Sequence, residues 1–92
     1  MARVKIEVRR PEEGELESRG ILSWPIWSCQ PSTFDWFYSD RETCYVLEGR
    51  VTVETDEGNV SFGPGDLVVF PQGLSCVWKV EEAVRKHYTF GL

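Results

Sequence analysis

Short runs of apolar and polar residues alternate along the chain and predict its elements. Val4, Ile6 and Val8 alternate with charged residues, the pattern of a strand with one buried face. Residues 67–70, Leu-Val-Val-Phe, are apolar at every position, so we expect a strand that is buried on both faces. Turn-forming residues recur at short intervals between these runs, as is typical of an all-β sandwich or barrel.

The rest of the pattern completes an all-β prediction without a long helix. Pro25, inside an aromatic run, cannot donate to a sheet ladder and belongs at a strand start or an edge. The polar segment 11–20 holds at most a short helical turn, anchored by Leu16. Turns are expected at Glu48–Gly49 and at 56–59. Together the runs predict about eight to ten strands. The other strands are expected at 32–38, 43–47, 50–54, 60–62, 76–80 and 84–90.

The composition is that of one small folded domain. Of the 92 residues, 41% are hydrophobic and 13% aromatic, which suits a packed protein rather than a disordered one. We expect a single domain over residues 1–92. A domain of this size buries only roughly 60–65% of its unfolded surface. Association with a second copy would add burial, so we expect a homodimer, with the strand around Ile6 available for pairing.

The charge pattern narrows the range of partners. The formal net charge is −5, which argues against nucleic acid as a partner, because phosphate binding needs a basic surface. No apolar run approaches the roughly 20 residues that a membrane span requires. The first residues lack the apolar core of a signal peptide. We therefore expect a cytoplasmic protein with no membrane partner, although the loss of an organelle transit segment would leave no trace.

Three cysteines, Cys29, Cys44 and Cys76, are too few and too irregular for a disulfide framework. Their number is odd and no Cys-x-x-Cys spacing occurs. The simplest interpretation is three buried free thiols. A reactive or metal-binding thiol is the alternative.

Two motifs of fixed spacing resemble those of the cupins. The first has a glutamate followed, after six residues, by glycine; the second has two glycines and a proline, and then a cysteine where cupins usually carry a histidine. These positions are Glu42 and Gly49 in the first motif, and Gly65, Pro71, Gly73 and Cys76 in the second. The resemblance implies a double-stranded β-helix, a jelly-roll barrel with a pocket open at one end.

Further stretches narrow the resemblance to a family of small single-domain cupins of largely unknown function. They are similar to the cupin modules of (S)-ureidoglycine aminohydrolase and of an ethanolamine-utilisation protein. Dimerisation through the sheets is common among cupins, which also favours a homodimer. The stretches are Trp24-Pro25-Ile26-Trp27, Phe34-Asp35-Trp36, Glu42-Thr43-Cys44, Phe70-Pro71 and Arg85-Lys86-His87-Tyr88.

The resemblance also implies a metal site, for which this chain lacks the residues. Cupins typically hold a divalent metal with three histidines and one glutamate, and Glu42 alone remains of that set. The His-x-His pair falls on Trp36 and Tyr38, or on Asp35 and Phe37 in the other register. We therefore expect no metal cofactor. The alternative is a zinc site of mixed softness, since zinc accepts both carboxylate and thiolate ligands. Its ligands would be Glu42, Cys44 and Cys76.

Alternation along the last strand points Lys86 into the barrel. Lys86 shares its parity with Val84, Tyr88 and Phe90, whereas His87 has the opposite parity and is expected to face outward. A lysine inside a barrel either has a lowered pKa or finds an anionic partner, for which Glu42 is the natural candidate. The alternative is a side chain that snorkels at the barrel mouth.

These residues predict a pocket for a small polar or anionic metabolite, bound without metal. Tryptophans would supply flat apolar walls, tyrosines hydrogen bonds, and lysine charge. The alternative function is an enzyme acting on a small nitrogenous or carbonyl metabolite, with Glu42 as base and Tyr38 or Lys86 as acid. A structural module whose tryptophans only pack is the third possibility. The predicted ligand-binding residues are Trp36, Tyr38, Glu42, Cys76, Trp78, Lys86 and Tyr88.

Overall fold

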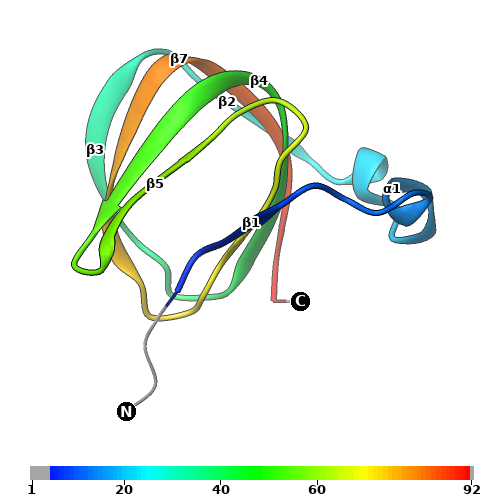
Figure 1. The fold of residues 1–92 in the computed structure, drawn as a ribbon, viewed down its shortest axis with the longest axis horizontal. Helices are drawn as coiled ribbons and strands as arrows, with labels where there is room; N and C mark the ends of the chain where they lie inside the picture. Colours follow the sequence, from blue (N-terminus) through cyan, green and yellow to red (C-terminus); the bar gives the residue numbers. More distant parts are fainter. Residues whose placement is uncertain (1–4, 92) are drawn as a thin grey trace.

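The computed structural model describes residues 5–91, and antiparallel strands dominate it. The strands wind around a barrel, with one helical excursion to the side (Figure 1). The all-β prediction is confirmed. The elements are β1 (Glu7–Arg9), α1 (Glu15–Ser18), the 3-10 turn η1 (Ile21–Ser23), β2 (Ile26–Cys29), β3 (Ser32–Phe37), β4 (Glu42–Thr55), β5 (Gly58–Phe62), β6 (Leu67–Phe70) and β7 (Ser75–Phe90).

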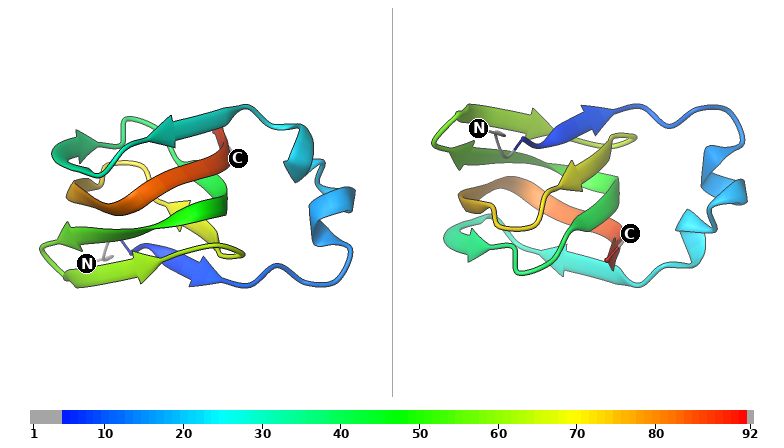
Figure 2. Two further views of the ribbon diagram at one scale, coloured as in Figure 1. Left: turned by 90° about the horizontal axis from the view of Figure 1, so that it is seen from above. Right: turned by 90° about the horizontal axis from the view of Figure 1, so that it is seen from below.

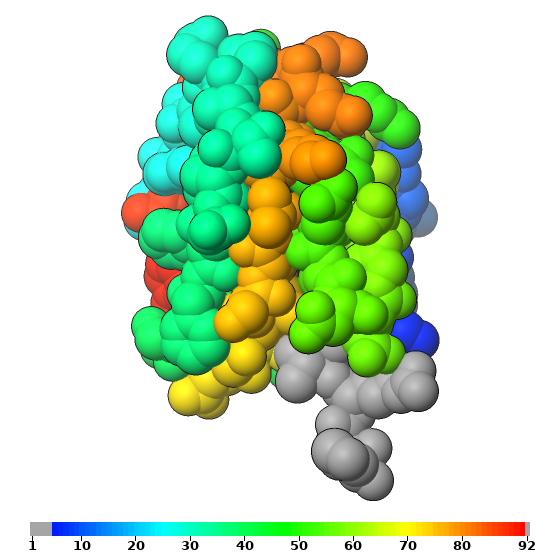
Figure 3. Space-filling view, turned by 90° about the vertical axis from the view of Figure 1, so that its left-hand side faces the viewer, coloured from blue at the N-terminus to red at the C-terminus, as the bar shows by residue number. Residues whose placement is uncertain are grey.

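Two long strands, β4 and β7, pair with each other and belong to both faces of the barrel. The first part of β4 pairs with β6, and its second part pairs with β5. In the same way β7 pairs first with β3 and then with β2, while β1 extends the sheet beyond β6. The two faces lie opposite each other in Figure 2, and Figure 3 shows β3, β7, β4 and β5 side by side on one of them. This arrangement agrees with the predicted jelly roll.

The predicted turn at Glu48–Gly49 is wrong, because β4 continues through it. The pairing with β7 is irregular there, with shifts of register between Val46 and Val51. Val46 and Val51 are both fully buried, although they differ in parity. An extra residue in one strand has this effect, since it moves the following side chains to the opposite face. Gly49 has a φ of 96°, and a Cβ there would collide with the backbone of Ala83.

The predicted break in the last strand is also wrong, because β7 is continuous. The sequence suggests an interruption where two acidic residues and Ala83 stand between apolar runs. In the structure this stretch stays in the ladder: Glu82 pairs with Arg50, and Arg85 with Glu48. The described residues therefore form seven strands, fewer than predicted, because the sequence pattern divides both long strands in two.

Other predicted elements are found where we expect them. The hairpin between β4 and β5 turns at Asp56–Glu57, and all of β6 except Val69 is buried. Pro25 directly precedes β2, an edge strand, and its carbonyl accepts a hydrogen bond from the backbone N–H of Tyr88. Of the predicted first strand, Ile6 is buried, while Val4 lies outside the described residues.

Residues 11–24 form the excursion that projects beyond the barrel in Figure 2. Glu15 organises it: the carboxylate accepts hydrogen bonds from Arg9 at 2.6 and 2.8 Å and from Arg19 at 3.0 Å. Leu16 is half-buried in the short α1, and Ile21 of η1 is fully buried. No helix among residues 5–91 has the length and apolar character needed to cross a membrane.

Candidate functional site

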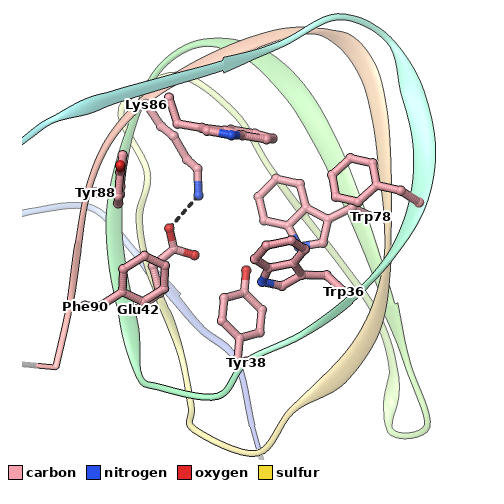
Figure 4. Close-up of a pocket in the computed structure, with 9 residues that line it drawn as sticks. Trp36, Tyr38, Glu42, Trp78, Lys86, Tyr88 and Phe90 are labelled. Carbon is pink, nitrogen blue, oxygen red and sulfur yellow. Dashed lines mark hydrogen bonds and ion pairs between the residues drawn. The ribbon is translucent and has the colours of Figure 1, made fainter.

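A pocket of about 220 Å³ lies inside the barrel. Its wall is aromatic apart from one acidic and one basic side chain (Figure 4). Of the seven residues that the sequence predicts as ligand-binding, six line it. The lining residues are Trp27, Phe34, Trp36, Tyr38, Glu42, Trp78, Lys86, Tyr88 and Phe90.

Most of these side chains face the interior because alternate residues of a strand point to the same face. Trp78, Lys86 and Tyr88 occupy even positions of β7, and all three point into the barrel, although the pairing with β4 is irregular between Trp78 and Lys86. Glu42 is the first residue of β4. Tyr38 follows β3, where its backbone N–H donates to the carbonyl of Leu74 at 2.8 Å.

Lys86 and Glu42 form a buried ion pair. The Lys86 Nζ donates to Glu42 Oε2 at 2.8 Å, and the two side chains are only 4% and 5% exposed. Figure 4 shows the two groups pointing toward each other across the pocket. The expected partnership is therefore present, and the alternative of a lysine snorkelling at the mouth is not what the structure shows. Removing two charges from water costs several kcal/mol per ion before their attraction offsets it.

Aromatic faces surround the Lys86 ammonium on the sides that Glu42 leaves open. The Nζ lies 4.8 Å from the ring centroid of Trp78, 5.2 Å from that of Trp27 and 5.9 Å from that of Phe70. At such distances the negative face of an aromatic ring attracts a cation. The ammonium group is therefore surrounded by one carboxylate and three rings, all of which attract a cation.

The hydroxyl of Tyr38 is directed into the same space (Figure 4). Burial, and then the nearby charge of Glu42, raise the pKa of Tyr38 above its ordinary value. Its ring stacks on Phe70, with 4.8 Å between the centroids. The hydroxyl therefore stays protonated at neutral pH and lies beside the Glu42 carboxylate, with which it interacts.

Two tryptophans of the pocket differ in their exposure to solvent. Trp36 is 47% exposed and meets the ring of Tyr38 edge-on, so it forms an outer part of the wall. Trp78 is almost fully buried, and its indole Nε1 has no hydrogen-bond partner within residues 5–91. A buried donor without an acceptor costs about 1–3 kcal/mol.

Two of the three thiols, those of Cys44 and Cys76, are buried, whereas Cys29 is half-buried. Burial raises the pKa of Cys44 to about 12 and that of Cys76 to about 11. Cys76 does not line the aromatic pocket. It lines a shallower hollow between β3 and the β4–β5 hairpin, and its Sγ lies 3.6 Å from the carbonyl oxygen of Trp36.

The residues present do not fit the metal site that the resemblance to the cupins implies. No group of three or more His, Cys, Asp or Glu side chains in the described part of the chain is placed to hold a metal ion, so Glu42, Cys44 and Cys76 do not form the alternative zinc site. The Glu42 carboxylate is already engaged by an ammonium group. Thiols with a raised pKa are also poor ligands, because metals bind the thiolate.

Three pocket residues are absent from the sequence-predicted set: Trp27, Phe34 and Phe90. Phe90 shares the parity of Lys86, so alternation alone identifies it. Phe34 shares the parity of Trp36 in the same way. Trp27 pairs with Lys86 between β2 and β7, and this pairing depends on a sheet register that the sequence pattern does not reveal.

His87 points away from the pocket, as expected, but it is buried. It is only 7% exposed, because η1 and the residues after it cover this part of β7. Its Nδ1 lies 2.8 Å from the carbonyl oxygen of Trp24. The histidine therefore attaches the excursion to the barrel and takes no part in the pocket.

Comparison with known proteins places the chain among proteins of the same fold. A DUF861 family protein from Thermotoga maritima, of known crystal structure, is 45% identical, and the likeness covers 95% of this chain and all of that one, with a TM-score of 0.91. The EutQ protein of Clostridium difficile is 28% identical, with a TM-score of 0.66, over 71% of this chain and 52% of that one.

The curated acetate kinase EutQ of Clostridioides difficile strain 630 is 29% identical over 73 residues, which make up 79% of this chain and 46% of that protein. The chain thus spans about half the length of the EutQ proteins that it matches. The model of the EutQ-like cupin domain matches residues 16–88. The resemblance to the cupins is confirmed, and the chain belongs to the family of EutQ-like cupin domains.

Proposed function

We propose that the barrel pocket binds a small polar metabolite through Lys86 and Glu42, without a metal. The observation that carries the proposal is a buried ion pair inside an otherwise aromatic pocket. A buried pair is often no more stabilising than apolar side chains of the same volume. Its presence in a cavity therefore supports a role in recognition, since few, well-placed polar groups in an apolar wall are typical of ligand sites.

The size of the pocket limits the ligand. At about 220 Å³ it lies below the range of roughly 300–1,000 Å³ that holds drug-sized molecules. The ligand is therefore a small metabolite with a flat or apolar part, which the tryptophan and tyrosine rings contact.

A fragment titration followed by NMR tests this proposal. Small polar fragments should shift the backbone amide signals of the strands that carry the pocket, and the amides around Lys86 should respond most. The double variant Glu42→Gln/Lys86→Met keeps the volume and removes both charges, so it should fold and lose binding.

The matched control is Arg85→Met, at the residue of β7 next to Lys86. It removes an exposed ion pair between Arg85 and Glu48 of β4. It should bind fragments like the wild type. Equal binding by the wild type and by the double variant would contradict the proposal that Lys86 and Glu42 bind the ligand.

The alternative function is an enzyme acting on a small nitrogenous or carbonyl metabolite. It is supported by the proximity of a carboxylate, an ammonium and a protonated hydroxyl, a set capable of proton transfer. In this case Glu42 would act as base, with Tyr38 or Lys86 as acid. Turnover of ureide-like compounds that is lost in Glu42→Ala would support it, whereas equal rates would remove it.

We also propose that the protein forms a homodimer. In the described residues β1 is the outer strand of its sheet, and Val8 on it is 37% exposed. An edge strand offers unpaired backbone groups to a second copy. Sedimentation at micromolar concentration should show twice the monomer mass, 10.6 kDa per chain; a monomer alone would contradict the proposal.

A further inference from the structure

We infer that the pocket selects uncharged ligands that carry a hydrogen-bond acceptor and a donor side by side, as a carboxamide or a lactam does. The inference rests on the proposed function and names the ligand class for the same site. It follows from the charge of the pocket wall, the geometry of the ion pair and the aromatic surfaces around it.

The pocket wall has no net charge. Lys86 and Glu42 are the charged side chains among the lining residues, and they neutralise each other at 2.8 Å. An incoming anion would have to share the ammonium with the carboxylate, which places two negative charges around one positive charge in a site of low dielectric constant. An incoming cation would have to share the Glu42 carboxylate with Lys86, which places two positive charges around one negative charge. Depriving one member of a buried pair of its partner is strongly destabilising.

An uncharged ligand avoids this conflict. The ammonium has three N–H donors and the carboxylate two acceptor oxygens, so each has capacity beyond their shared bond. A carbonyl oxygen and an N–H group on the same carbon match this neighbouring donor and acceptor, because one atom accepts from Lys86 while the other donates to Glu42. Both new bonds involve an ionised partner, which makes them stronger than bonds between neutral groups.

The remaining polar atoms of the wall favour an acceptor on the ligand. The Tyr38 hydroxyl remains protonated, and the buried Trp78 Nε1 has no acceptor within the described chain. Both are donors, and a carbonyl oxygen has two lone pairs to offer. The chain as a whole carries a net charge of −5, which further disfavours anions at long range.

Aromatic rings shape the rest of the ligand. Trp36 and Trp78 present flat surfaces, and Tyr88 and Phe90 lie on the opposite side of the ion pair in Figure 4. A planar ligand gains offset or edge contacts with such rings. A carboxamide attached to a small ring combines both requirements.

Three probes that share one ring and differ in charge test the inference: benzamide, benzoate and benzylammonium. Dissociation constants are measured by NMR titration at pH 7 and constant ionic strength. Benzamide should bind at least about tenfold more tightly than either ion, a difference of about 1.4 kcal/mol. The preference should disappear in Glu42→Gln/Lys86→Met and persist in Arg85→Met.

The outcomes separate the inference from the proposed function. Benzoate or benzylammonium binding as tightly as benzamide would overturn the inference and leave a pocket for charged ligands. Binding of other fragments without benzamide would also overturn it. If neither these probes nor any fragment binds, the proposed function fails as well.

Discussion

At the residue scale, burying the ion pair of Lys86 and Glu42 costs desolvation energy, and it also provides the charged groups of the pocket. Both side chains are buried, although both line the pocket. The pair of Arg85 and Glu48 is exposed instead: 50% of the Arg85 side chain and 65% of the Glu48 side chain are accessible. The contrast allows the energetic effect of burial to be measured within one strand.

Lys86→Met should lower the free energy of unfolding by about 3–5 kcal/mol, because it leaves the Glu42 carboxylate buried without a partner. The double variant Glu42→Gln/Lys86→Met should recover most of this loss. Arg85→Met should change stability by about 0–1 kcal/mol, as exposed pairs do. Urea unfolding at pH 7 provides all three values. A double variant as unstable as Lys86→Met would show that packing, and not the unpaired charge, is responsible.

Cys44 should make stability fall in alkaline solution. Burial raises its pKa from 9.0 to about 12, so the folded protein keeps the thiol proton while the unfolded chain releases it above pH 9. The contribution of this thiol is therefore complete below pH 9 and decreases as the pH rises. Between pH 8 and pH 10 the wild type should lose about 1.4 kcal/mol more than Cys44→Ala.

The control for this comparison is Cys29→Ala, at a half-buried thiol near the end of β2. Urea unfolding curves at the two pH values give the difference for each variant. Equal pH dependence in Cys44→Ala and the wild type would contradict the assignment to Cys44.

At the element scale, the irregular pairing in the middle of β4 allows one strand to serve both faces of the barrel. The shift in parity between Val46 and Val51 directs both side chains into the core. Gly49 lies at this point because the backbone of β7 approaches closely. A Cβ there would lie 2.6 Å from the Cα of Val84. The glycine of the first cupin motif therefore has a packing role as well as a conformational one.

Gly49→Ala should destabilise the protein more than Gly73→Ala. The two glycines have nearly the same φ, 96° and 91°, but nothing lies within 4 Å of a Cβ at Gly73. Positive φ alone costs alanine about 1–2 kcal/mol, and the close contact should add about 1–3 kcal/mol at Gly49. Thermal or urea unfolding measures both. Equal losses would mean that backbone conformation accounts for the whole effect.

The excursion over residues 11–24 should open locally when Glu15 is neutralised. Hydrogen bonds from Arg9, then from the backbone and Arg19, hold the pKa of Glu15 far below its usual range. Its stabilising effect is therefore present above the ordinary carboxyl pKa and persists until the pH falls well below it. In Glu15→Gln, amide hydrogen exchange over Ser18–Gly20 should become faster while the barrel amides stay unchanged. Glu17→Gln is the control, and faster exchange in both variants would exclude a specific role for Glu15.

At the scale of the whole molecule, the sequence pattern predicts the fold class and most of the pocket, but not the continuity of the strands. Turn glycines, Pro71 and alternation are local signals, and they suffice for the barrel and for the inward position of Lys86. The covering of His87 and the pairing of Trp27 with Lys86 depend on contacts between distant segments. No local pattern encodes these contacts. That residues 1–92 form one domain stays a prediction.

The two shared strands also determine how the chain must fold. β4 and β7 pair along most of their lengths, yet the partners lie tens of residues apart in sequence. Such non-local pairing requires closure of long loops before any contact compensates for the lost chain entropy, and proteins of this kind fold in milliseconds to seconds. Because each long strand contributes to both faces, neither face is complete without the other. The barrel should therefore form in one slow, cooperative step, and its two faces should share one rate of unfolding.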